Sequence, residues 1–360
     1  MRLRLLRSLI FFSCGLVGAC QQPGETSLTI RWEGERATGI SIPQRAVGAV
    51  LADSLDRMFA VRLAGKETAM LGTYRVAVDA VIFEPVVPFT RGLRYTVWRN
   101  GKQFGEITIP ALAADDRPTL LAIYPSSDSL PDNLLKIYLH FSRPMRDGQS
   151  RKYVAMLKNA ADTLPGVFLD LQPELWNADR TLLTLWLDPG RIKRDLRPNK
   201  RLGAPLQPGG SYRVVISGDW TDEQGASLGK PTQKTFRTIQ RDSLPLVPAR
   251  WTIRQPQPGS GPLEVAFGEA LDYSLLTETL HVLHEDGKVV SGKWQPGDDE
   301  KRASFTPDAA WQAGRYRLRI ESRLEDLAGN NINRPFDRDV TRPGTRVATQ
   351  RFTERVFSIR

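Results

Sequence analysis

Short stretches of the chain alternate hydrophobic and polar residues, which is the pattern of β-strands with one buried face. In the clearest stretch, Tyr316, Leu318 and Ile320 are separated by charged residues, so one face is apolar and the other charged. Similar alternation covers residues 28–32, 135–141, 212–217 and 263–267. Helical spacing is confined to residues 46–59 and 269–280, where we expect one or two helical turns. The pattern therefore predicts a chain made mainly of strands.

Part of this pattern is repeated along the chain. Residues 210–228 and 314–332 align without a gap, and in both a strand is followed by an Asp-x-x-Gly turn. The turns begin at Asp222 and Asp326, and an aspartate at this position caps the backbone of its own turn. The alternative for these acids is calcium binding at an edge between domains, through carboxylate and carbonyl oxygens. Each turn holds only one or two acids, so we expect the capping role.

A more divergent copy lies nearer the N-terminus. It is carried by aromatic, proline and glycine residues. Phe83, Pro85, Phe89 and Gly92 have the spacing of Phe305, Pro307, Trp311 and Gly314, and a tyrosine follows each glycine, Tyr95 three positions later and Tyr316 two positions later. Two segments rich in proline or charge, residues 110–118 and 238–250, are typical of linkers between modules. Strand units with Pro and Gly punctuation predict antiparallel β-sandwiches in a row. We place these sandwiches, behind a signal segment at residues 1–19, at residues 20–112, 118–240 and 250–360.

The opening of the second predicted domain resembles a known family. Residues 123–133 read IYPSSDSLPDN and are followed by a strand and by Phe-Ser-Arg-Pro-Met at residues 141–145. This order resembles the start of bacterial Ig-like domains of the S-layer SbsA type, and residues 210–225 resemble the closing half of such domains. The third domain resembles the closing half at residues 324–330. It departs at residues 268–271, where Gly-Glu-Ala-Leu replaces Ser-x-Pro-Met.

The resemblance carries expectations for fold and for function. It implies an all-β fold, namely tandem antiparallel Ig-like β-sandwich domains with minor helical turns. It also implies a spacer or interaction module in an envelope protein, and it supplies no catalytic residues. The first domain matches only around residues 83–95, so its membership of the family stays open.

The first twenty residues have the composition of an export signal. Three arginines are followed by an apolar run from Leu9 to Val17, which is too short to span a bilayer. The small residues before Cys20 resemble a bacterial lipobox, so we expect cleavage before Cys20 and acylation of its thiol. Several acyl chains on one residue anchor a protein firmly to a membrane. Gln21 favours the outer membrane. The alternative is a plain secretory signal in which the cysteine is incidental.

Composition limits the chemistry of the chain. Its 360 residues are 41% hydrophobic, which is enough for several cored domains. The two cysteines, Cys14 and Cys20, lie near the N-terminus, which excludes a disulfide framework in the body of the protein. His140 falls on the outward face of its strand, and His281 and His284 are predicted to face opposite sides of theirs. Nucleotide-binding, metalloprotease and hydrolase motifs do not occur in the sequence. We therefore expect no enzyme, no cofactor and no bound metal.

The formal net charge is +10, but most basic residues are scattered among acids. Nucleic-acid binding is excluded because the sequence has no basic stripe and no recognised motif. Two basic segments remain, the arginine-rich tail at residues 334–360 and the insert GRIKRDLRPNKRLG at residues 190–203. Each is either a solvated surface or a contact for an anionic partner such as lipid headgroups or glycan. The candidate binding residues of the insert are Arg191, Lys193, Arg194 and Arg197.

Trp98 is the remaining candidate binding residue. It falls on the strand face opposite Tyr95 and Val97, where an exposed indole can stack on a sugar ring. Two functional hypotheses follow. The first is a structural, scaffold or interaction role for a lipoprotein anchored through Cys20, with an envelope protein or glycan as partner. The second is a carbohydrate-binding module of the cell surface. A hydrolase built on paired carboxylates is the third. Its candidate acids, at residues 298–300 and 325–326, are adjacent in the sequence and are therefore predicted to point apart or into a loop.

Overall fold

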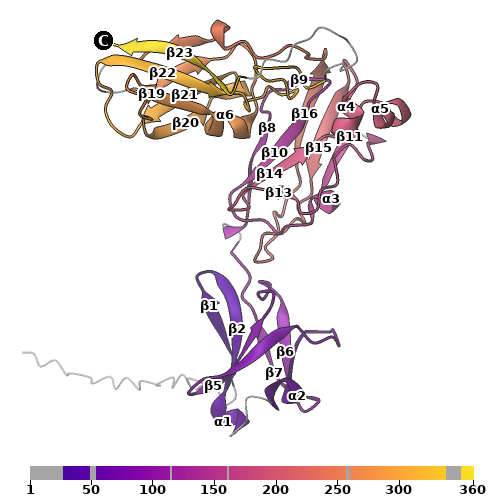
Figure 1. Ribbon diagram of the computed structural model, residues 1–360. Coiled ribbons are helices and arrows are strands. Elements are labelled where there is room, and N and C mark those ends of the chain that lie inside the picture. The colour runs from indigo at the N-terminus through magenta and orange to yellow at the C-terminus, as the bar shows by residue number, and fades with distance from the viewer. Residues whose placement is uncertain are drawn as a thin grey trace, which may run out of the picture. The chain divides into compact units, whose positions relative to one another are not determined.

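The computed structural model describes residues 27–48, 54–113, 116–159, 162–256, 259, 261–337 and 350–360. Its paired strands are antiparallel except where β9 (Ser129–Pro131) runs parallel to β16 (Thr232–Ile239). The chain divides into two compact units, residues 1–111 and 112–360. Figure 1 shows one sandwich in the first unit and two in the second. The predicted fold class, all-β with Ig-like sandwiches, is confirmed.

The first unit is a sandwich of two sheets with strand orders β1-β2-β5-β4 and β3-β6-β7. Its strands are β1 (Thr29–Glu33), β2 (Arg36–Pro43), β3 (Phe59–Leu63), β4 (Gly72–Val76), β5 (Ala80–Pro85), β6 (Arg94–Arg99) and β7 (Lys102–Thr108). Two single-turn helices, α1 (Gln44–Val47) and α2 (Leu55–Met58), lie between β2 and β3 in the sequence. The inner faces of both sheets close over a core that includes Ile40, Val61 and Val97.

The second unit begins with a larger sandwich, of orders β13-β14-β10-β8 and β12-β11-β15-β16-β9. Its other strands are β8 (Leu120–Tyr124), β10 (Lys136–Phe141), β11 (Val154–Lys158), β12 (Asp162–Thr163), β13 (Leu175–Trp176), β14 (Leu182–Trp186) and β15 (Ser211–Ile216). Three short helices accompany them: α3 (Ser150–Tyr153), α4 (Pro189–Ile192) and α5 (Arg197–Leu202). Two of the edge strands, β12 and β13, are only two residues long.

The third sandwich completes the second unit and has orders β17-β18-β21-β20 and β19-β22-β23. Its strands are β17 (Thr252–Arg254), β18 (Leu263–Ala266), β19 (Leu280–His284), β20 (Gly292–Pro296), β21 (Arg302–Pro307), β22 (Gly314–Glu321) and β23 (Phe352–Ile359). Helix α6 (Tyr273–Thr279) precedes β19, and the 3-10 turns η3 (Pro248–Arg250) and η4 (Asp298–Glu300) precede β17 and β21. The alternation predicted on β22 is confirmed, because Tyr316, Leu318 and Ile320 are all buried.

The first and third sandwiches share a row of packed aromatic side chains. In the third, Trp294, Phe305, Trp311 and Tyr316 follow one another with ring centroids 5.2, 6.0 and 5.3 Å apart. In the first, Tyr74, Phe83, Phe89 and Tyr95 do the same at 4.8, 6.3 and 4.7 Å. Residues 83–95 and 305–316 therefore resemble each other in sequence because their aromatic side chains pack in the same arrangement.

A tyrosine hydroxyl fixes the same corner in all three sandwiches. The hydroxyl of Tyr95 accepts the N–H of Thr90 at 2.9 Å, and that of Tyr212 accepts the N–H of Gln207 at 2.7 Å. The hydroxyl of Tyr316 donates to the carbonyl of Gln312 at 3.0 Å. Such a tyrosine corner ties the start of a strand to the loop before it in Ig-like sandwiches. It explains why the tyrosine is the best preserved position of the repeats.

Helical segments are short, as predicted. Helices α1, α2 and α6 fall in or beside the two stretches where one or two helical turns are expected. The insert at residues 190–203 contains most of α4 and all of α5. Proline occupies the first turn of each helix, and the carboxylate of Asp188 caps α4 by accepting the N–H of Gly190 at 2.8 Å. Within the described residues, no helix is long and apolar enough to cross a membrane.

Candidate functional site

The residues predicted for membrane anchoring and for binding fall in different parts of the molecule. Cys20 and its lipobox lie outside the described residues, so the predicted lipidation stays a prediction. Trp98 lies in the first unit, on β6. The four basic candidates lie in the second unit, on or beside α4 and α5. Trp98 and the basic candidates therefore belong to different units of the chain and are described separately.

Trp98 faces outward from the sheet β3-β6-β7, opposite the buried side chains of Tyr95 and Val97. Its indole N–H donates to the hydroxyl of Thr96 at 2.9 Å. The guanidinium of Arg62 lies 4.7 Å from the ring centroid, which is within range of a cation–π contact. These residues line a hollow whose other side chains are mainly polar or charged, with Lys66, Glu67, Arg94, Gln103 and Glu106 among them.

Three of the four basic candidates of the insert contact their own chain. Arg191 donates to the carbonyl oxygens of Gly166 and Gly203, at 2.8 and 3.0 Å. The ammonium of Lys193 lies 4.3 Å from the ring centroid of Phe336. Arg194 donates to the carboxylate of Asp337 at 2.9 Å, and Arg241 donates to the same oxygen at 2.7 Å. The contacts of Lys193 and Arg194 join the insert to residues 336–337, the segment that follows the turn of the third sandwich.

Arg197 differs from the other three because it lies on the exposed side of α5. It lines a shallow hollow together with Pro198, Lys200 and Arg201. The basic character of the insert is therefore divided between two roles. One part fastens the insert to the third sandwich, and the other part faces solvent.

The junction between the second and third sandwiches is built on the outer face of β10. The ammonium of Lys136 lies 2.9 Å from a carboxylate oxygen of Asp272 and 2.8 Å from one of Glu325. The hydroxyl of Tyr138 lies within 2.8 Å of both oxygens of Asp272 and donates to that carboxylate. Asp272 also caps α6 by accepting the N–H of Leu275 at 3.0 Å. One carboxylate thus serves both the helix of one sandwich and the strand of the other.

Further contacts extend this junction. The rings of Tyr124 and Tyr273 stack with centroids 3.6 Å apart and planes 11° apart. The carboxylate of Glu300, which is 1% exposed, accepts the N–H of Ser126 at 2.9 and 3.1 Å. The N–H of Leu135 donates to a carbonyl in the turn of the third sandwich. The junction therefore combines charged, aromatic and backbone contacts.

The junction corrects one prediction from the sequence. Lys136 and Tyr138 alternate with apolar residues, so the sequence places them on the solvent face of their strand. The third sandwich covers that face, and Tyr138 is only 4% exposed. His140, two residues further along, remains half-buried. The signal available in the sequence was the pair of acids at residues 325–326, of which Glu325 points to Lys136 while Asp326 points into its own turn.

Burial and charge shift the pKa values of the junction groups. Burial acts to lower the pKa of Lys136, but the carboxylates of Asp272 and Glu325 outweigh it and raise that pKa. Burial raises the pKa of Glu325, against the opposing effect of Lys136, and it raises that of Glu300. Burial and the neighbouring carboxylate of Asp272 raise the pKa of Tyr138. The ammonium is thus held charged between two carboxylates.

The two repeat turns use their aspartates as predicted. Asp222 accepts the N–H groups of Gln224 and Ala226 at 2.9 and 2.8 Å. Asp326 accepts the N–H groups of Ala328 and Asn330 at 2.8 and 2.9 Å. The capping role is therefore confirmed at both turns.

Asp326 also belongs to a cluster of three acids. Its carboxylate and those of Asp242 and Glu269 place one oxygen each within 4.8 Å of one another, a spacing that can hold a cation. Burial raises the pKa of Asp326 to about 7. Burial, together with the charge of Asp242, raises the pKa of Glu269 to about 7.

The two histidines of β19 have different partners: His281 contacts Glu321 and His284 contacts Asp286.

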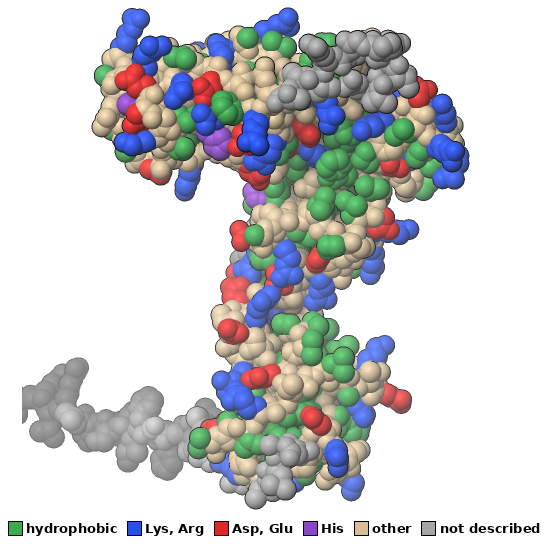
Figure 2. Space-filling view, in the orientation of Figure 1, with side chains coloured by type: hydrophobic (Ala, Val, Ile, Leu, Met, Phe, Trp, Pro, Cys, Tyr) green, Lys and Arg blue, Asp and Glu red, His purple; other side chains and the backbone are tan. Residues whose placement is uncertain are grey.

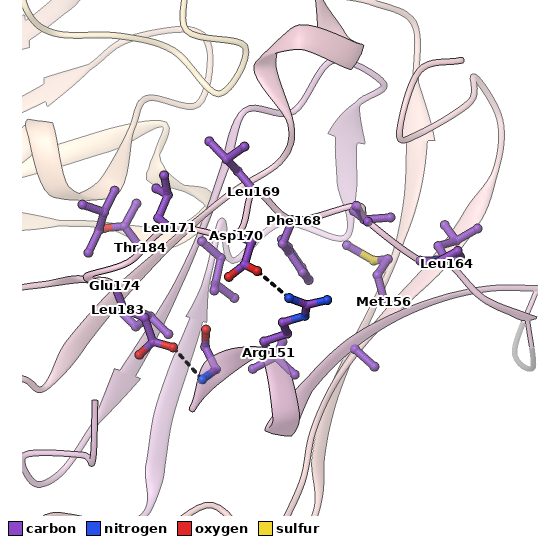
Figure 3. Close-up of a pocket in the computed structure, with 18 of the residues that line it drawn as sticks. Arg151, Met156, Leu164, Phe168, Leu169, Asp170, Leu171, Glu174, Leu183 and Thr184 are labelled. Carbon is purple, nitrogen blue, oxygen red and sulfur yellow. Dashed lines mark hydrogen bonds and ion pairs between the residues drawn. The ribbon is translucent and has the colours of Figure 1, made fainter. Parts of the chain in front are cut away.

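The second sandwich also contains an apolar pocket of about 420 Å³ (Figure 3). It lies beside the short edge strands β12 and β13, where a connecting segment at residues 164–174 passes from one sheet to the other. Met156 on β11 and Leu183 and Leu185 on β14 supply lining from the inner faces of the two sheets. An apolar pocket of this size with a few polar groups is a typical ligand site. Nothing in the alternation of the sequence predicted it.

Comparison with known proteins supports the Ig-like fold of the third sandwich. Residues 254–341 match the family model of the bacterial Ig-like domain. No curated protein matches the chain. The match falls on the third domain, whereas the fuller opening motif of the sequence lies in the second. The S-layer SbsA type in particular is not distinguished by this match.

Several solved structures resemble the chain distantly. Native alpha-2-macroglobulin of E. coli is 14% identical with a TM-score of 0.24, over 57% of this chain and 13% of that one. The N-terminal part of the bacterial S-layer protein SbsC is 10% identical with a TM-score of 0.24, over 69% and 45%. The Bacteroides ovatus protein SGBP-B, in complex with a mixed-linkage heptasaccharide, is 14% identical with a TM-score of 0.19, over 85% and 64%. The chain thus spans less than half of the first two structures, and values this low assign no function.

Proposed function

We propose that this protein is a membrane-anchored envelope lipoprotein whose Ig-like sandwiches act as a structural, scaffold or protein-interaction module. The observation that carries the proposal is the junction of Lys136, Tyr138, Asp272 and Glu325. Domains joined by a small polar interface normally move relative to each other. A junction that combines a buried ion pair with two stacked, half-buried rings supports a fixed pair of sandwiches, as a scaffold requires.

The chemistry of the junction favours one defined arrangement of the second and third sandwiches over a contact that can slide. A buried charge is costly unless its partners are correctly placed, so a displaced third sandwich leaves Lys136 or Asp272 unpaired. Asp272 also caps α6, so sliding at the junction disturbs that helix as well. In this protein the buried ion pair therefore acts as a registry device, which keeps the two sandwiches in one arrangement.

The membrane anchor is part of the same proposal. It rests on the basic start, the apolar run and the small residues that precede Cys20. Acylation at Cys20 anchors the chain at a membrane of the cell envelope, with the outer membrane as the proposed destination. The partner is an envelope protein or glycan, and the role is not enzymatic.

The experiment that tests this proposal is crosslinking of the protein in intact cells, followed by mass spectrometry. Cys20→Ala is the control, because it removes the acylated thiol and leaves the sandwiches unchanged. We expect fatty-acid labelling and membrane fractionation to be lost in Cys20→Ala, together with a discrete crosslinked protein partner. A wild-type protein that carries no fatty acid contradicts the anchor. Absence of any crosslinked partner contradicts the scaffold role, whereas glycan retained without a protein partner favours the carbohydrate-binding alternative.

A second candidate function, carbohydrate binding, is favoured by the surroundings of Trp98. An indole beside guanidinium, amide and carboxylate groups is a common arrangement for a sugar, which offers an apolar ring face and many hydroxyls. Trp98→Ala is expected to abolish retention on polysaccharide columns. Trp32→Ala is a matched control, since the guanidinium of Arg91 lies 4.6 Å from that ring centroid. Equal retention of both variants and the wild type excludes a sugar site at Trp98.

A further inference from the structure

The pocket of the second sandwich has features that the scaffold role does not explain. Met156 and Val167 at its lining are at most 3% exposed, so the pocket reaches the hydrophobic core. Figure 3 shows the ion pair of Arg151 and Asp170 at the pocket, with Phe168 among the other lining residues. Its connecting segment reads Leu-Pro-Gly-Val-Phe-Leu-Asp-Leu at residues 164–171, and Leu169 is 40% exposed beside the opening. Figure 2 shows hydrophobic side chains gathered on one face of this sandwich.

The mouth of the pocket presents one accessible cation. Arg151 forms an ion pair with Asp170 at 2.5 Å, yet its side chain is 82% exposed, so solvent reaches most of the guanidinium. The carboxylate of Glu174 is occupied by the N–H groups of Gly148, Ser150 and the indole of Trp176. These hydrogen bonds lower its pKa, against the opposing effect of burial, and offset its charge. An anionic group at the mouth therefore meets Arg151 with its charge only partly neutralised.

We propose that this pocket binds a straight alkyl chain with an anionic head group. The chain lies between the two sheets, along the aliphatic lining, and the head group accepts hydrogen bonds from Arg151 in exchange for Asp170. An apolar cavity of about 150 Å³ holds one benzene ring. A volume of about 420 Å³ is nearly three times as large and accommodates a chain of medium length. The carboxylate of a free fatty acid and the phosphate of a single-chain phospholipid share this chemistry.

The test is titration calorimetry of the full-length protein with monomeric octanoate, decanoate, dodecanoate and hexadecanoate. Burial of each added methylene is expected to raise the affinity about fourfold, until the pocket is full and the affinity levels off. A lysophosphatidylglycerol with a dodecanoyl chain is titrated in parallel. Tighter binding of the phospholipid assigns the site to membrane lipid, and tighter binding of dodecanoate assigns it to free fatty acid. Absence of saturable binding by both overturns the proposal.

Two variants and a matched control locate the binding. Arg151→Glu is expected to weaken dodecanoate binding about fivefold, because it reverses the charge at the mouth, and to leave dodecanol binding unchanged. Arg254→Glu is the control, since Arg254 forms an equally exposed ion pair with Glu264 in the third sandwich. Leu164→Trp fills the pocket from a half-buried loop position and is expected to weaken both ligands. Equal affinities in Arg151→Glu and Arg254→Glu overturn the head-group assignment.

A photoreactive dodecanoate gives a readout of position. We expect its label on peptides that contain residues 150–171, and less of it in Leu164→Trp. Label confined to other parts of the chain overturns the proposal. A different outcome is a protein that does not bind dodecanoate but self-associates, with the self-association weakened in Leu164→Trp. This result assigns the pocket to a second copy of the chain and overturns the lipid assignment.

Discussion

The first and third sandwiches have the same strand order and the same aromatic row, but they differ in the connection between their last two strands. In the first, Asn100 and Gly101 join β6 directly to β7, and both have positive φ, as a tight hairpin turn requires. In the third, residues 322–351 separate β22 from β23. Glu325 and Asp337, which contact the second sandwich, both come from this longer connection.

The difference shows that the core residues specify the fold of each sandwich, whereas the connecting segments specify how two sandwiches are joined. The aromatic row and the tyrosine corner are satisfied within each sandwich, so they specify the fold of each one by itself. The residues that fasten the third sandwich to the second lie at strand ends and in the long connection. A short hairpin such as that of β6 and β7 offers no comparable set. The predictions below test this separation, from the largest expected effect to the smallest.

The largest effect is expected from Lys136→Met. The substitution removes the ammonium and leaves the carboxylates of Asp272 and Glu325 together in a buried site, which costs about 3–5 kcal/mol of unfolding free energy. Urea unfolding followed by hydrogen exchange should place the loss in the second unit and spare the first. Lys293→Met, at an exposed position on β20, is the control. Similar losses in the two variants contradict the importance of the junction.

The aromatic row is tested by Gly72→Ala and Gly292→Ala. In the first sandwich an added Cβ lies 2.5 Å from the carbonyl oxygen of Glu84 and 2.6 Å from the ring of Phe83. In the third it meets the carbonyl oxygen of Thr306 and the ring of Phe305 in the same way. Overpacking of this kind costs about 1–3 kcal/mol. The two losses should be similar, because the two rows are alike. Thermal unfolding of each variant measures them, and a loss in only one sandwich shows that the likeness of the rows is superficial.

A smaller effect is expected from the tyrosine corner. Tyr95→Phe and Tyr212→Phe each remove a hydroxyl that accepts a backbone N–H, at a cost of about 1 kcal/mol. The two variants should lose similar amounts, although their sandwiches differ in size and in connections. Chemical denaturation with tryptophan fluorescence provides the measurement. A corner that matters in one sandwich and not in the other separates the repeats energetically.

The smallest effect is a pH dependence of the second unit that involves Glu269, because this carboxyl is only half-buried and solvent screens its charge. Folding raises the pKa of Asp326 and of Glu269 from 3.8 and 4.5 to about 7, so both acids bind protons more tightly in the folded state. Their contribution to stability is complete below about pH 4 and is lost as the pH rises through 7. Glu269→Gln should flatten the fall in melting temperature between pH 5 and pH 8. An unchanged slope in this variant rules out the effect.

The sequence predicted what each sandwich settles locally. Alternation identified the buried side of β22, and the spacing of Phe83, Phe89 and Gly92 identified the first sandwich as a divergent copy of the third. The sequence did not predict which polar residues on the outer face of a sheet are covered by another domain. Nothing near Lys136 in the sequence indicates that Asp272 will cover it, because the covering element is specified in another domain. The fold of each module is local information, whereas the junction depends on pairs of residues far apart in the chain.

The binding candidates follow the same division. Trp98 was found from strand alternation, and it does face outward. The basic insert was recognised from its composition, but composition could not reveal that Arg194 reaches Asp337. The pocket depends on two edge strands that end after two residues and on the apolar segment between them. That segment has no alternation, and its mainly apolar stretch at residues 164–169 was the available signal.

The polar character of the junction has a consequence for synthesis of the chain. Lys136 precedes Asp272 by 136 residues and Glu325 by 189, so the second sandwich is complete before its partners have been translated. A face of leucines left uncovered for that interval would attract other unfinished chains. The ammonium of Lys136 and the hydroxyl of Tyr138 are instead hydrated by water until their partners have been made. The surface that later joins the two sandwiches can therefore stay exposed to solvent without promoting aggregation of incomplete chains.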